Sequence, residues 1–331
     1  MRRNFPPVEE IVIGIRSGSR VALGQAITLV ESARPEHQIL AREAIGRLLT
    51  TAPAAATTLR IGITGAPGVG KSSLIEVLGM HLLAQGRRVA VLAIDPSSSI
   101  SRGSILGDKT RMEQLSMAEG AFVRPSPSGS SLGGVARKTR ETILLVEAAG
   151  YDTILIETVG VGQSEVAVHR MTDIFLLLLL PGAGDELQGI KRGIVEMADL
   201  LAVNKADGDR LALARQAGQH YRSAVHLLPE KASGWSPQVL TCSAQDGTGI
   251  TELWAALLRC HEWTRQNGFY TANRQQQAQY WLEEALQTGL QALFQNHAGA
   301  RQLLKTLEPE VQAGRLSPFA AAEQVLFAFK K

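Results

Sequence analysis

The feature that most constrains the fold is an eight-residue glycine-rich loop between a predicted strand and a predicted helix. It comprises Gly65, Ala66, Pro67, Gly68, Val69, Gly70, Lys71 and Ser72, with Ser73 following. Glycines let successive backbone N–H groups turn toward one anion, which the positive end of the following helix also faces. In this pattern the lysine contacts nucleotide β- and γ-phosphates and the serine coordinates Mg²⁺. A glycine-rich turn that binds nothing is disfavoured for two reasons. A chance match to this eight-residue pattern is rare at typical residue frequencies, and the pattern lies between a predicted strand and a predicted helix, as a phosphate-binding loop does.

Short β-rich runs alternate with longer amphipathic stretches from residue 59 onward. The runs are residues 60–64, 88–94, 121–123, 153–157, 174–180, 200–204 and 238–241. This alternation is typical of a parallel sheet covered by helices. We therefore predict an α/β P-loop NTPase fold with a mostly parallel central sheet.

Helical patterns flank this core on both sides. We expect an N-terminal helical extension over residues 1–57, a P-loop GTPase domain over 58–267 and a C-terminal helical arm over 268–331. The apolar stripe of the arm has two interpretations, packing on its own domain or contact with another molecule.

Composition argues against several classes of function. The net charge of +3 comes from 34 basic and 31 acidic residues spread along the chain, so we expect no nucleic-acid partner. The most apolar run, 174–180, is far shorter than the roughly 20 residues of a membrane helix, and no secretory signal is evident. Cys242 and Cys260 show neither a disulfide framework nor metal-ligand spacing. We expect a cytoplasmic protein with no membrane association.

Two short motifs predict which nucleotide binds. Asn204, Lys205 and Asp207 form an Asn-Lys-x-Asp motif directly after one predicted strand, and Ser243 and Ala244 directly follow another. A carboxylate at the fourth position can accept hydrogen bonds from the ring N–H and the exocyclic amine of guanine. Adenine offers neither donor there, so we predict GTP and GDP as ligands. A polar helix cap is the alternative interpretation of Asp207.

Four oxygen-bearing residues are candidate Mg²⁺ ligands: Ser72, Asp95, Asp108 and Glu157. Asp95 ends a strand that we expect beside the phosphate loop, and Glu157 ends another, where Mg²⁺ or its waters would lie. Asp108 is a looser candidate, and ordinary helix capping is the alternative for Asp95. We assign catalytic roles to Lys71 and to the three carboxylates.

The residue that would orient the attacking water is displaced from its usual place. Small GTPases carry Asp-x-x-Gly followed at once by a glutamine. Here the acid is Glu157, Gly160 follows in register, and the glutamine arrives two places later as Gln163. We therefore expect slow intrinsic GTP hydrolysis, completed by a group or rearrangement supplied through a partner.

Taken together, the ordered motifs closely resemble the MeaB/ArgK family of P-loop GTPases. They lie at residues 65–73, 95–98, 124–127, 132–135, 157–165, 181–185 and 204–207. The resemblance covers residues 58 to about 265 and implies a G-protein chaperone of adenosylcobalamin-dependent methylmalonyl-CoA mutase. It implies a homodimer that gates cofactor loading and protects or reactivates the mutase. It also implies a third switch over 181–191, in which Asp185 and Lys191 couple nucleotide state to the mutase.

Other functions remain open from the residues alone. A P-loop kinase for a small molecule or protein would need an acceptor pocket and a general base, neither of which the sequence identifies. A scaffold that binds nucleotide without hydrolysis is hard to reconcile with Lys71, Ser72 and Glu157. The family's older association with basic amino-acid transport is disfavoured by the guanine motif and by the lack of a membrane segment.

Overall fold

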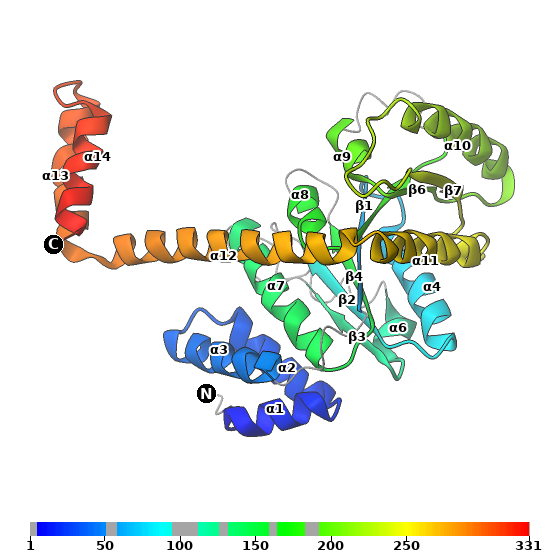
Figure 1. The fold of residues 1–331 in the computed structure, drawn as a ribbon, viewed down its shortest axis with the longest axis horizontal. Coiled ribbons are helices and arrows are strands. Elements are labelled where there is room, and N and C mark those ends of the chain that lie inside the picture. The colour runs from blue at the N-terminus through cyan, green and yellow to red at the C-terminus, as the bar shows by residue number, and fades with distance from the viewer. Residues whose placement is uncertain are drawn as a thin grey trace. The chain divides into compact units, whose positions relative to one another are not determined.

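The computed structural model describes residues 5–50, 58–94, 112–125, 132–158, 164–182 and 192–330. The chain divides into two compact units, Met1–Arg274 and Gln275–Lys331. The first unit contains a seven-stranded sheet in the order β3-β2-β4-β1-β5-β6-β7, and every pairing in it is parallel (Figure 1). Its strands are β1 (Leu59–Gly65), β2 (Val89–Ile94), β3 (Ala121–Arg124), β4 (Thr153–Thr158), β5 (Ile174–Leu179), β6 (Leu200–Val203) and β7 (Gln238–Thr241). The predicted α/β fold with a parallel sheet is confirmed.

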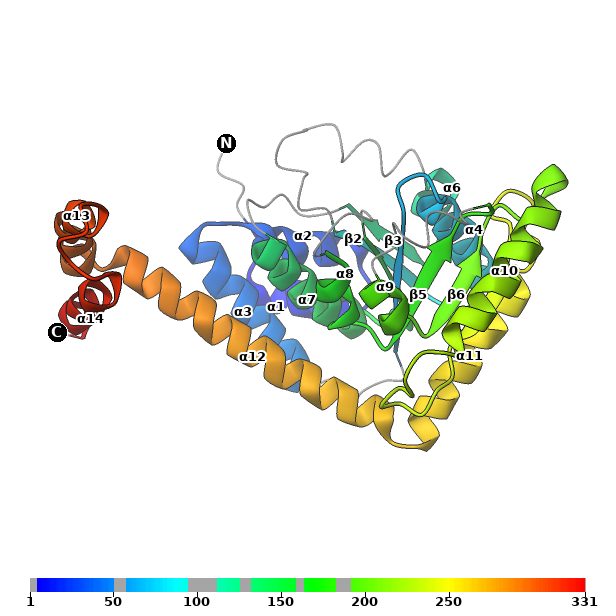
Figure 2. The ribbon, with the colours of Figure 1, turned by 90° about the horizontal axis from the view of Figure 1, so that it is seen from above.

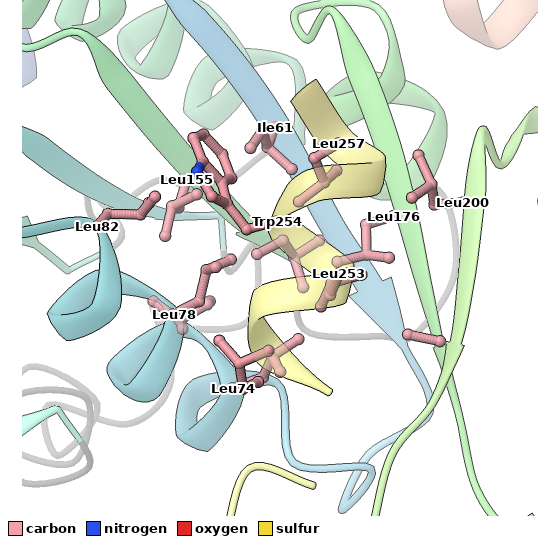
Figure 3. Close-up of a cluster of buried hydrophobic side chains, with 14 of the residues drawn as sticks. Ile61, Leu74, Leu78, Leu82, Leu155, Leu176, Leu200, Leu253, Trp254 and Leu257 are labelled. Atoms are coloured by element: carbon pink, nitrogen blue, oxygen red, sulfur yellow. The ribbon is translucent and has the colours of Figure 1, made fainter. Parts of the chain in front are cut away.

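Helices cover both faces of this sheet because its central strands are apolar on both sides. One face carries α4 (Lys71–Ala84), α6 (Glu113–Met117) and α11 (Ile250–Gln266). In Figure 3, Leu78 of α4 and Trp254 and Leu257 of α11 pack against strand residues that include Ile61 and Leu176. These side chains form the main core of the unit.

The opposite face is covered by α7 (Leu132–Ala148), α8 (Ser164–His169), α9 (Arg192–Met197) and, after the short 3₁₀ helix η2 (Gly208–Arg210), α10 (Leu211–Val225). Gly62 of β1 allows a close approach there, because a Cβ at this position would lie 2.8 Å from side-chain atoms of Phe175 and Val168. The result is a three-layer arrangement in which the carboxyl ends of the parallel strands lie along one edge of the sheet.

Three N-terminal helices belong to the first compact unit. They are α1 (Val8–Arg16), α2 (Arg20–Glu31) and α3 (Pro35–Thr50), and all three contact α7 (Figure 1). Leu23, Ile27 and Val30 recur on one face of α2 and are buried. Glu31 of α2 also forms an ion pair with Arg124 of β3. The predicted N-terminal helices therefore pack on the P-loop domain itself.

The described residues of the second compact unit form helices and the short segments that join them. Helix α12 (Phe269–Asn296) begins in the first unit and continues into the second, which also holds α13 (Ala298–Gln312) and α14 (Pro318–Phe329). These last two helices pack side by side in Figures 1 and 2. The Nδ1 atom of His297 accepts a hydrogen bond from the Ala300 N–H at 3.0 Å and so caps α13. In neither unit does a described helix have the length and apolar character needed to cross a membrane.

Candidate guanine-nucleotide site

The glycine-rich loop joins β1 to α4, as the strand–loop–helix pattern predicts. Gly65 ends β1, and a Cβ there would lie 2.5 Å from the Leu178 carbonyl oxygen of β5. Gly70 precedes α4 with a φ of 94°, and a Cβ there would lie 2.7 Å from Nδ2 of Asn204. Both positions therefore require glycine for close backbone approach, and Gly70 requires it for its left-handed conformation as well.

Lys71 lies across the loop as the first residue of α4. Its Nζ donates hydrogen bonds to the carbonyl oxygens of Gly65 at 2.8 Å and Ala66 at 3.2 Å, and the residue is buried. The Leu74 N–H donates to the Gly70 carbonyl at 2.9 Å, so the N–H groups of Lys71 and Ser72 precede this first helical bond. N–H groups at this end of a helix are available to an anion, and the helix dipole favours negative charge there.

Ser72 and Glu157 meet at the carboxyl edge of the sheet. The Ser72 hydroxyl donates to Oε1 of Glu157 at 2.9 Å. Glu157 lies one residue before the end of β4 and pairs with Ile63 of β1. Next to it, the Thr158 hydroxyl donates to Oγ1 of Thr64 at 2.9 Å. Two of the four candidate Mg²⁺ ligands are therefore in contact.

The sheet order corrects one part of the metal prediction. We expected the strand that leads to Asp95 to lie beside the strand of the phosphate loop. Instead β4 pairs with both β1 and β2 and separates them. Glu157 therefore belongs to the strand adjacent to the phosphate loop, and Asp95 follows the strand beyond it. Strand order depends on long-range pairing, which local sequence patterns do not encode.

Several predicted residues lie outside the described part of the chain: Asp95, Asp108, Gly160, Gln163, Asp185 and Lys191. Within the described ranges there is no group of three or more His, Cys, Asp and Glu side chains able to hold a metal ion. Two of the candidate ligands, Ser72 and Glu157, remain within those ranges.

Asn204 connects three loops that are far apart in the sequence. It is 1% exposed, and its Nδ2 donates to the carbonyl oxygen of Val69 in the phosphate loop at 2.8 Å. Its Oδ1 accepts the Ala244 N–H at 3.1 Å. The structure therefore places the Asn-Lys-x-Asp motif, the phosphate loop and the Ser-Ala pair in direct contact.

Asp207 and Ser243 form the second link of this assembly. The Ser243 hydroxyl donates to Oδ2 of Asp207 at 2.7 Å and accepts the N–H groups of Gln245 and Asp246 at 3.2 and 3.4 Å. Ser243 is fully buried, whereas Asp207 is partly exposed. The hydroxyl therefore holds the carboxylate in one orientation.

Two features of this site were not predicted from the sequence: the backbone conformation of Lys205, itself a predicted site residue, and the hydrogen bond of Cys242. Lys205 has a φ of 59°, a left-handed conformation uncommon for a non-glycine residue. The Cys242 thiol donates to Oδ1 of Asn204 at 3.9 Å, and burial raises its pKa to about 12, so it stays neutral. Its position directly before Ser243 was the available sequence signal. Cysteine spacing is informative about disulfides and metal sites, and it does not identify a neutral thiol that donates a hydrogen bond.

Comparison with known proteins agrees with this geometry. Residues 23–298 match the family described as methylmalonyl-CoA mutase-associated GTPase MeaB. A putative GTPase of Caulobacter vibrioides is 52% identical over 313 residues, covering 95% of each chain. The mitochondrial methylmalonic aciduria type A homolog of Mus musculus is 46% identical, covering 98% of this chain and 80% of that one.

A solved structure extends the agreement to three dimensions. The crystal structure of a LAO/AO transport system kinase has a TM-score of 0.76 and 38% identity, covering all of both chains. With the phosphate loop and base motif in contact, these matches establish the activity as GTP hydrolysis. The chain belongs to the MeaB family of methylmalonyl-CoA mutase-associated GTPases.

Proposed function

We propose that this GTPase is a chaperone of an adenosylcobalamin-dependent methylmalonyl-CoA mutase, which gates cofactor loading and protects or reactivates the mutase. The family match over residues 23–298 carries the proposal, and the similarity to the methylmalonic aciduria type A homolog supports it. Phosphate release from GTP, measured with and without purified mutase, tests it. We expect mutase to accelerate release. If mutase neither binds nor changes the rate, the chaperone function is refuted while GTP hydrolysis stands.

We further propose that Asp207 reads guanine and that Asn204 braces its loop against the phosphate loop. The support is the Ser243 hydrogen bond to Asp207, together with the two hydrogen bonds of Asn204. Adenine would leave the carboxylate without its two donors, and such a loss can amount to several kcal/mol, roughly a thousandfold or more in selectivity.

Hydrolysis on this proposal depends on Mg²⁺ at the carboxyl edge of the sheet. A hydroxyl and a carboxylate are the hard oxygen donors that Mg²⁺ prefers, and Ser72 and Glu157 supply them in contact. Asp95 and Asp108 would add ligands, directly or through water. When bound, the metal would neutralise charge on the β- and γ-phosphates. Lys71 would move from its loop carbonyls to the same phosphates.

We propose that Asp185 and Lys191 couple nucleotide state to the mutase, and the support is the third switch that the family resemblance implies. Replacing either residue with Ala should leave basal GTP hydrolysis within about twofold and reduce acceleration by mutase, since coupling energies typically fall in the range of about 1–3 kcal/mol. Unchanged acceleration in both variants would remove these residues from the coupling.

The C-terminal arm is proposed to form a homodimer. Leu282, Leu286, Leu290 and Leu293 of α12 are 58% to 62% exposed, and their spacing places them on one helical face. A second copy would bury this stripe by helix–helix packing. Light scattering should show a dimer that dissociates when Leu286 and Leu290 are both changed to Glu. Thr288→Glu, on the opposite face, should remain dimeric, and a monomeric wild type at tens of micromolar would refute the proposal.

A P-loop kinase is the second candidate, because the similar solved structure is titled a transport system kinase. The two functions differ in the fate of the γ-phosphate. GTP labelled at that position should yield inorganic phosphate alone if the protein is a GTPase switch. Label appearing in a small molecule or in a protein would favour the kinase.

A further inference from the structure

A cavity of about 310 Å³ lies at the amino ends of β5 and β6, within the first compact unit. Its apolar wall is formed by Ile174 and Phe175 of β5, Met197 of α9 and Phe269 of α12. The other end of β5 pairs with Gly65 of the phosphate loop. The cavity and the candidate nucleotide site therefore lie at opposite edges of the sheet, and none of the residues placed in the nucleotide site lines the cavity.

His169, the last residue of α8, lines this cavity with unused hydrogen-bonding capacity. Its ring packs edge-on against Phe175, with the ring centroids 5.4 Å apart, and no described residue forms a hydrogen bond with either ring nitrogen. Burial lowers the pKa of His169, against the opposing effect of the Asp199 charge. The imidazole is therefore neutral near pH 7, and one of its nitrogens is a hydrogen-bond acceptor.

Asn273 of α12 contributes a second unused acceptor to the same cavity. Its Nδ2 donates to the Thr172 carbonyl oxygen at 3.5 Å, which is long for a hydrogen bond. Among the described residues, its Oδ1 accepts no hydrogen bond. Two side chains from different helices, α8 and α12, thus keep acceptors for a donor that enters the cavity.

Acidic side chains outnumber basic ones along the cavity wall. Its Asp, Glu and Lys members are Asp173, Glu196, Asp199 and Lys231. Lys231 donates through Nζ to Oδ1 of Asp199, so these two charges offset each other. Asp173 is ion-paired with Arg274, which lies outside the lining. Glu196 adds a carboxylate on the exposed side, so the cavity favours a cation over an anion.

We propose that this cavity is a second ligand site, which binds a small organic cation with a flat apolar body, such as an aryl amidinium. The N–H groups of the cation would donate to the His169 ring and to Oδ1 of Asn273, and its apolar body would lie against Phe175 and Met197. A preformed apolar cavity with a few converging polar groups is the usual form of a small-molecule site. The occupant would bridge the end of α8 and the start of α12.

Methyl NMR of the full chain with GDP, labelled at its methionines, tests this site with benzamidine, benzamide and benzoate. The three probes share one ring and differ in charge, and Met197→Leu identifies the Met197 signal. Benzamidine should shift that signal saturably, with a Kd of about 1 mM, as expected for so small a ligand. Benzamide should bind about tenfold more weakly, because it lacks charge-assisted hydrogen bonds. Benzoate should cause no shift at about 10 mM.

Variants of the two acceptors locate the binding. His169→Phe keeps an aromatic ring against Phe175 but removes the nitrogens, and it should weaken benzamidine binding at least about fivefold, as should Asn273→Ala. The matched control is His220→Phe, an exposed position on α10 outside the lining, which should leave the affinity unchanged.

GDP affinity reports whether each variant is folded, and it should stay within about twofold in all three, because the nucleotide site is at the other edge of the sheet. Should His169→Phe not fold, Asn273→Ala alone decides. The inference is overturned by the absence of a Met197 shift, by benzamide or benzoate binding as tightly as benzamidine, or by unchanged benzamidine affinity in the folded acceptor variants. None of these outcomes depends on the mutase, so the chaperone function stands or falls separately.

Discussion

Replacing Asn204 with Ala tests whether the base-reading loop and the phosphate loop form one braced unit. The substitution removes the hydrogen bond to the Val69 carbonyl at 2.8 Å and the one from the Ala244 N–H at 3.1 Å. Because Asn204 is 1% exposed, both partners would be left at a buried position. A buried polar group that loses its partner costs about 1–3 kcal/mol. The two together predict a loss of about 2–5 kcal/mol in the free energy of unfolding.

Urea denaturation of the nucleotide-free protein, followed by tryptophan fluorescence, measures this loss. Asn204→Asp separates the two bonds, because it keeps an acceptor for Ala244 but places an oxygen opposite the Val69 carbonyl. It should therefore also destabilise the protein. Asn273→Ala is a matched control with one long contact of 3.5 Å to the Thr172 carbonyl, and it should cost less than about 1 kcal/mol. A loss below about 0.5 kcal/mol for Asn204→Ala, with unchanged GDP affinity, would refute the brace.

Contacts elsewhere in the chain lead to three more expected outcomes. Lys71→Ala should abolish measurable GTP hydrolysis, followed by phosphate release, and weaken nucleotide binding, followed by titration with fluorescent GDP. Full activity in this variant would contradict the role assigned to the phosphate loop. Arg274→Ala should lower the free energy of unfolding in urea by about 3 kcal/mol, because it removes the ion pair of the Asp173 carboxylate, whereas Glu147 keeps its ion pair with Arg60. An effect under about 1 kcal/mol would contradict this. Burial lowers the pKa of His261 below 6.5, so the unfolded chain binds this proton at a higher pH than the folded chain does. Thermal unfolding should therefore show the free energy of unfolding falling as pH drops below about 6.5. His261→Phe should make this pH dependence shallower, and an unchanged pH dependence would exclude His261 as its source.

Local patterns were sufficient to predict the elements of the fold. Strand β5 is a run of six buried apolar residues that begins directly after Asp173. The glycine-rich loop predicts both the strand before it, β1, and the helix after it, α4. The residues that form the nucleotide site could be named for a similar reason, because they lie at or just beyond the ends of predicted strands.

Long-range geometry could not be predicted in this way. The Asn204–Val69 hydrogen bond spans 135 residues, and the insertion of β4 between β1 and β2 is a matter of pairing rather than propensity. The sequence around Glu76 predicts only a helix, and it does not reveal that the Glu76 carboxylate accepts the N–H groups of Gln114 and Leu115 in α6. The packing of α1–α3 on α7 likewise depends on which apolar faces meet, which a single sequence does not specify.

The most direct test of guanine-specific hydrolysis is single-turnover phosphate release from GTP, ATP and XTP by the purified protein with Mg²⁺. We expect slow release from GTP and no release above background from ATP. Asp207→Asn should shift the preference from GTP to XTP, because its amide donor would face the xanthine carbonyl. Equal rates with GTP and ATP in the wild type, or an unchanged guanine preference in Asp207→Asn, would contradict the claim that this site reads guanine and hydrolyses GTP.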